Sequence, residues 1–107
     1  MGIHDLTTAL SFIQKDLSLP ESEINLSEKP ELEELHQYLT AAIRKLLNKD
    51  FNRLINILYR IDITESRVAK VLHTDDPMQI ASELASLVIE RELQKVATRK
   101  IYANRDL

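Results

Sequence analysis

The near absence of glycine constrains the fold of this chain more than any other feature. Gly2 is the single glycine among 107 residues, and only three prolines are present. Tight hairpin turns need residues that accept positive φ, above all glycine, so a hairpin-rich β architecture is not expected. Leu, Ile, Ala, Glu, Lys and Arg dominate the sequence instead, and these residues favour helix. We therefore predict an all-α protein.

The length and the charge balance narrow the classes of protein further. A chain of 107 residues with 44% hydrophobic and 29% charged residues fits one globular domain over residues 1–107. The chain has no cysteine, which excludes disulfides, thiol catalysis and cysteine-ligated zinc. Its start lacks a signal peptide, and no apolar run approaches the ~20 residues of a membrane span. We expect a cytoplasmic protein with no membrane partner.

The first helix is predicted by apolar residues that recur at steps of three and four. Ile3, Leu6, Leu10, Ile13 and Leu17 give this spacing, which indicates a helix over residues 4–17. Residues 18–29 contain a proline and show no periodicity, so they are predicted to form a long loop. A long connection would leave helix one free to move or to swap between subunits.

The centre of the sequence predicts a helical hairpin over residues 30–61. Leu32 and Phe51 belong to its two apolar stripes, and Asp50 is expected to cap the second helix. Thr64 is then expected to cap a short helix that ends near His73. The predicted core draws on apolar residues from every helix: Leu10, Ile13, Leu35, Leu39, Ile43, Leu54, Leu58, Val68, Leu72, Leu84, Leu87 and Val88.

The last helix is expected to be the longest element of an irregular bundle of four to five helices. Asp76 followed by Pro77 is a strong start signal, and no helix breaker occurs before Tyr102. A helix over 77–102 measures roughly 39 Å, whereas a compact chain of this size is about 34 Å across. Its end should therefore protrude, either as a frayed tail over 103–107 or against the partner in a homodimer.

Patterns typical of catalysis or metal binding are incomplete. Glu33 and His36 form one Glu-x-x-His unit, but a di-iron carboxylate site needs two such units and two further glutamates. A glycine-rich phosphate loop and a Gly-x-Ser-x-Gly elbow are both ruled out by the glycine count. We expect no metal and no cofactor, and we favour a protein that is not an enzyme.

Basic residues are concentrated late in the sequence. A helix-turn-helix formed by residues 64–73 and the helix from Pro77 onward would need cations at the start of its recognition helix, and none occurs there before Arg91. Arg91, Lys95 and Arg99 instead recur every fourth residue and line one face of the last helix. Two interpretations stay open for this face. It is either a solvated helix end that complements the dipole, or a binding surface for an acidic partner or a nucleic acid backbone.

The segment Tyr59-Arg60-Ile61-Asp62 places two charges around an apolar residue at a predicted helix end. Arg60 or Asp62 is expected to pair with Glu90, Arg91 or Glu92. A structural ion pair is the favoured interpretation, and a ligand site that includes Tyr59 is the alternative.

The C-terminal half of the chain resembles a group of proteins. The segments 58–62, 89–95 and Thr98-Arg99 are similar to a pattern in small uncharacterised bacterial all-helical proteins. The resemblance implies a bacterial cytosolic origin, and it carries over no activity and no catalytic residue.

These observations favour a non-enzymatic interaction or assembly module. Its expected partner is a second copy, as a homodimer, or another protein. One alternative is a nucleic-acid-associated regulator that uses the basic face of the last helix; the other is a small enzyme or ligand-binding protein with an Arg/Glu/Tyr pocket. The candidate residues are Tyr59, Arg60, Asp62, Glu90, Arg91, Lys95 and Arg99.

Overall fold

The computed structural model confirms an all-α fold. It describes residues 3–17 and 31–105, and the side chains of residues 8–16 and 31–99. The described part of the chain contains five helices: α1 (Ile3–Leu17), α2 (Leu32–Lys49), α3 (Phe51–Arg60), α4 (Glu65–Leu72) and α5 (Pro77–Arg105). The long loop predicted over 18–29 lies outside the described residues.

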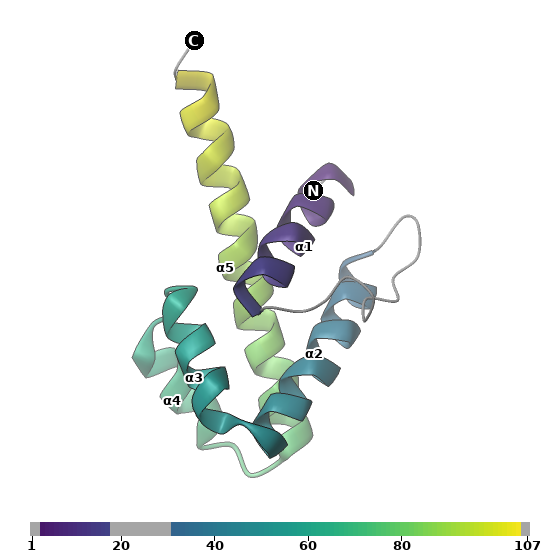
Figure 1. Cartoon of the computed structure of the whole chain (residues 1–107), viewed down its shortest axis with the longest axis vertical. Helices are drawn as coiled ribbons and strands as arrows, with labels where there is room; N and C mark the ends of the chain where they lie inside the picture. The colour runs from purple at the N-terminus through teal and green to yellow at the C-terminus, as the bar shows by residue number, and fades with distance from the viewer. Residues whose placement is uncertain (1–2, 18–30, 106–107) are drawn as a thin grey trace.

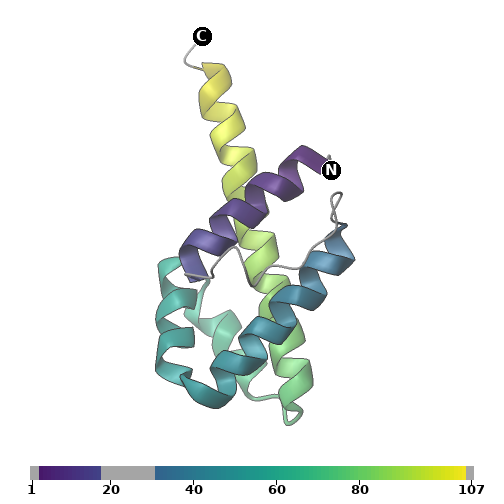
Figure 2. The same cartoon turned by 45° about the vertical axis from the view of Figure 1, so that its right-hand side comes forward.

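Helices α1, α2 and α4 all pack against α5. The first half of α5 packs against α2 and α4, and α1 crosses it further along, on the way to the C-terminal end (Figures 1 and 2). The molecule measures 48 × 31 × 21 Å, and a helix of 29 residues spans about 44 Å. The length of α5 therefore sets the longest dimension, and its C-terminal end projects beyond the other helices (Figure 1).

Helix starts follow the capping residues of the sequence. The Asp50 carboxylate accepts a hydrogen bond from the Arg53 N–H at 3.1 Å, so it caps α3 as predicted. Asp76 accepts one from the Met78 N–H at 3.0 Å at the start of α5. Thr64 takes the N-cap position of α4 but makes no side-chain capping bond. At its far end, α5 continues beyond the expected end at Tyr102 to Arg105.

The apolar core lies where α5 meets the α2–α3 hairpin. Leu39, Ile43, Leu58 and Leu84 are fully buried there, in agreement with the predicted core. Leu10, Leu72 and Leu87 are only partly buried and pack against its edge. Residues that the prediction missed also contribute: Ile57, Ile61, Ile63, Ala81, Ala85 and Ile89.

Two residues that were predicted to belong to the buried apolar stripes are exposed instead. Leu32 is 43% exposed and Phe51 is 45% exposed. Each is the first residue of its helix, so its side chain lies at the end of the stripe, where the opposing helix surface no longer covers it. Among the described residues, no helix is both long and apolar enough to cross a lipid bilayer.

Candidate functional site

The cations of α5 meet helix α1 at one groove. Arg91, Lys95 and Arg99 recur every fourth residue and so lie on the face of α5 that α1 crosses. α1 adds a further cation, Lys15. The groove between the two helices has a volume of about 360 Å³ and is lined by Phe12, Lys15, Asp16, Arg91, Lys95, Thr98 and Arg99.

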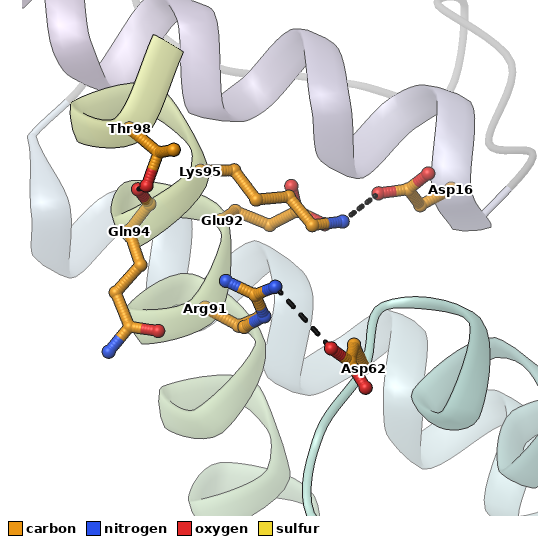
Figure 3. A network of polar contacts seen from close by, with 7 residues as sticks. All are labelled: Asp16, Asp62, Arg91, Glu92, Gln94, Lys95 and Thr98. Atoms are coloured by element: carbon orange, nitrogen blue, oxygen red, sulfur yellow. Dashed lines mark hydrogen bonds and ion pairs between the residues drawn. The ribbon is translucent and has the colours of Figure 1, made fainter. Parts of the chain in front are cut away.

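Arg91 is the first residue of α5 that lines this groove, and it pairs with Asp62. Its Nη2 atom lies 3.6 Å from Oδ2 of Asp62, an ion pair that Figure 3 shows beside the Lys95 contact. Asp62 has a φ of 74°, and its N–H donates to the Tyr59 carbonyl while the Ile63 N–H donates to the Leu58 carbonyl. This pair of bonds is a Schellman motif that ends α3, with Asp62 where glycine is usual. The motif turns the Asp62 carboxylate toward Arg91.

Lys95 lies between two carboxyl groups from different helices. Its Nζ atom is 3.4 Å from Oδ2 of Asp16 on α1 and 3.7 Å from Oε1 of Glu92 on α5. Figure 3 shows the three side chains converging at the α1–α5 contact, whereas Gln94 points to the other side of the helix. Lys95 and Asp16 are mostly buried, with 29% and 19% of their side chains exposed. Solvent therefore screens this pair less than a surface ion pair.

Glu92 is the one charged residue that is fully buried among the described residues, with 0% exposure. Neither of its carboxyl oxygens has a hydrogen-bond partner within the described part of the chain. Burial raises the pKa of Glu92, the nearby Asp16 carboxylate raises it further, and Lys95 lowers it; the pKa becomes about 8. Glu92 is therefore mostly neutral at pH 7, and the nearby Asp16 carboxylate favours this neutral state.

The neutral state of Glu92 leaves the groove positively charged. Lys15, Arg91, Lys95 and Arg99 are four basic residues against two acidic residues, Asp16 and Asp62, besides the neutral Glu92, so the groove has an excess of two basic residues. The chain as a whole has a net charge of -3. The groove is thus a local positive site on an acidic protein, which favours negatively charged groups of a partner.

Arg99 is held at the groove by an aromatic ring. Its Cζ atom lies 4.5 Å from the centroid of the Phe12 ring on α1. A guanidinium over a ring face is attracted by the ring quadrupole and keeps its N–H donors free for other partners. Arg99 is exposed, so its donors are accessible from solvent.

The structure brings together only part of the predicted site. Arg91, Lys95 and Arg99 share the groove, and Asp62 joins it through Arg91. Glu90 pairs instead with Arg67 of α4, at 3.0 Å. Tyr59 and Arg60 are exposed on the surface of α3. The expected ion pair between this corner and the last helix therefore exists between Asp62 and Arg91.

His36 of α2 forms a structural contact with α5. Its Nε2 atom lies 3.0 Å from the Ser82 carbonyl and 3.1 Å from the Ser86 hydroxyl. It is half-buried and lies in a different part of the molecule from the basic groove. No cluster of three or more metal-ligating side chains occurs in the described part of the chain.

Five residues at this site were not among the candidate residues: Phe12, Lys15, Asp16, Glu92 and Thr98. Glu92 was expected only as a possible partner of Arg60 or Asp62. A signal for Glu92 was present, because it is spaced four residues from both Val88 and Val96 and so falls within an apolar stripe of α5. No comparable signal marks Phe12, Lys15 or Asp16, because their role depends on where α1 crosses α5. Comparison with protein-family models, curated proteins and solved structures gives no match. The resemblance of the C-terminal half to small bacterial helical proteins stays a prediction.

Proposed function

We propose that this protein is a non-enzymatic interaction module that binds an acidic segment of a partner protein in the groove between α1 and α5. The observation that carries the proposal is the convergence of Lys15, Arg91, Lys95 and Arg99 on one groove of a chain whose net charge is negative. Carboxylates of a partner would form charge-assisted hydrogen bonds with these cations. Lys15 and Arg99 are exposed and form no ion pair within the described part of the chain, so a partner would contact them first.

A protein partner is favoured over nucleic acid by the size and charge of the site. Tight binding to a nucleic acid backbone uses many phosphate contacts over an extended basic surface. The groove here is about 360 Å³ and offers four cations. The chain as a whole has a net charge of -3, which would also repel a long polyanion that extends beyond the groove.

Charge reversal at the groove tests the proposal. The variant Lys15→Glu/Arg99→Glu changes the two groove cations that form no ion pair with the described residues. The matched control, Arg44→Glu/Lys45→Glu, makes the same change of net charge at two exposed positions of α2. Binding of a fluorescein-labelled hexaglutamate peptide is followed by fluorescence anisotropy at low and moderate salt.

The groove variant should weaken peptide binding at least about tenfold, which corresponds to ~1.4 kcal/mol, while the control binds nearly as the original protein does. Equal affinities for all three proteins would overturn the proposal. A labelled single-stranded oligonucleotide that binds more tightly than the peptide, and loses affinity in the groove variant, would favour the nucleic-acid alternative.

The projecting end of α5 favours self-association as a second candidate function. The helix extends past the rest of the bundle, as both views of the fold show (Figures 1 and 2). An isolated helix end is marginal in water and gains stability by packing against another helix. Light scattering across a wide range of protein concentrations tests this candidate, since a strict monomer throughout would remove it.

A further inference from the structure

The buried carboxyl group of Glu92 lacks the partner that its position demands. Both oxygens are fully buried without a hydrogen bond among the described residues. An ionised carboxylate left in this state is strongly unfavourable, so native proteins supply a partner or keep the group neutral. Lys95 Nζ, at 3.7 Å, attracts the group but is too distant for a hydrogen bond.

The nearest group on the opposing helix is itself an acid. Asp16 of α1 faces Glu92 across the helix contact, and both share Lys95 (Figure 3). Two ionised carboxylates would repel each other there, with a single ammonium group between them. A protonated Glu92 instead has an O–H that can donate to the Asp16 carboxylate, which is a strong bond because the acceptor is charged. Protonation of Glu92 therefore gives its carboxyl group a hydrogen-bond partner, the Asp16 carboxylate.

We propose that Asp16, Glu92 and Lys95 form a proton-operated latch that holds α1 on α5 when Glu92 is protonated and releases α1 when that proton is lost. The latch links the two helices that build the basic groove, since α1 contributes Phe12, Lys15 and Asp16 to it. Release of α1 therefore dismantles the groove. This consequence rests on the proposed function, whereas the movement of α1 does not.

Few charged groups affect the pKa of Glu92 in the latch. Asp16 on α1 and Lys95 on α5 are the two charged residues that shift the pKa of Glu92, and no charged side chain of the described parts of α2, α3 or α4 contributes. Burial is the largest cause of the rise to about 8. When α1 leaves, water reaches the carboxyl group and its pKa returns toward the ordinary value of about 4.3.

The sign of the pH effect follows from the difference between the pKa of Glu92 in the docked state and in the released state. Between about pH 4.3 and 8 the docked state holds one proton more than the released state. Raising the pH through this range therefore favours release, by up to about tenfold per pH unit. Above about pH 8 Glu92 is ionised in both states, so the equilibrium no longer changes with pH. Docking is tightest in mild acid and weakest from about pH 8 upward.

Distance measurements between spin labels test the movement of α1 directly. The chain has no cysteine, so Ser11→Cys on α1 and Ala97→Cys on α5 place two labels at defined, exposed positions. Double electron–electron resonance then reports the distance distribution at pH 5, 7, 8 and 9. The docked distance should lose population to longer distances from pH 5 to 8 and then stay constant.

Two further variants separate the latch from general effects of pH. Glu92→Gln keeps the size of the side chain and can donate to Asp16 at every pH, so its docked population should not change with pH. Glu90→Gln removes an exposed carboxylate on the same helix and should behave as the original protein does. A pH-independent distance in the original protein, or a pH effect that survives in Glu92→Gln, would refute the latch. Circular dichroism confirms that each variant is helical.

Binding of the hexaglutamate peptide connects the latch to the groove. If both proposals hold, affinity falls between pH 5 and 8 in the original protein and changes much less in Glu92→Gln. Affinity that is the same at all pH values in the original protein would overturn the link between latch and groove. If α1 moves with pH but the peptide binds at no pH, the proposed function fails while the latch stands.

Discussion

The two halves of α5 are stabilised by different means. From Pro77 to Ile89 the helix packs through aliphatic side chains against α2 and α4, and Leu84 and Val88 are buried among apolar residues. From Glu90 onward it meets α1 through a contact that includes a buried acid, a lysine and a second acid. The first half depends on apolar burial, which is nearly independent of pH and salt, whereas the second half adds this charged contact to the apolar burial of Val96 and of Ile13 on α1. The carboxyl group with the raised pKa, Glu92, therefore lies in the half of α5 that meets α1.

The largest effect is expected from a cavity in the apolar half. Leu84→Ala should lower the free energy of unfolding by about 2 to 5 kcal/mol, because Leu84 is fully buried and its neighbours cannot collapse into the space. Urea denaturation followed by circular dichroism measures the loss. Leu32→Ala is the control, since this exposed leucine should cost less than about 0.5 kcal/mol. A similar cost for both variants would contradict the assignment of the core.

Sequence reasoning succeeded in the apolar half for a physical reason. Helical periodicity reports which side of a helix is buried, so Leu39, Leu58 and Leu84 could be placed in the core without knowing their partners. Glu92 lies within the same kind of stripe, yet its burial depends on where α1 crosses α5. That crossing could not be predicted, because residues 18–29 carry no periodic signal. The cations of the groove were found on α5, but their companion Lys15 on α1 was not.

A smaller effect of the opposite sign is expected at the charged contact. Glu92→Met keeps a long unbranched side chain and removes the cost of burying a carboxyl group, so it should stabilise the protein by about 1 to 3 kcal/mol at pH 8. The gain should be smaller at pH 5, because Glu92 is then neutral in the folded protein. Urea denaturation at the two pH values gives the comparison.

Glu90→Met controls for a change of charge on the same helix. Glu90 is half exposed, so its replacement should alter stability by less than about 0.5 kcal/mol at either pH. A gain for Glu92→Met that is equal at pH 5 and pH 8 would mean that ionisation of Glu92 contributes nothing to the α1–α5 contact.

The smallest effect should come from the ion pair on the surface of the apolar half. Arg67 and Glu90 are 3.0 Å apart, but their side chains are 51% and 49% exposed. A double-mutant cycle with alanine should give a coupling energy of about 0.2 to 0.5 kcal/mol that decreases with added salt. The same cycle on Lys95 and Asp16 should give a larger coupling with a weaker salt dependence, because that pair is mostly buried. Equal couplings would show that burial does not distinguish the two contacts, and the proposed difference between the two halves of α5 would then be wrong.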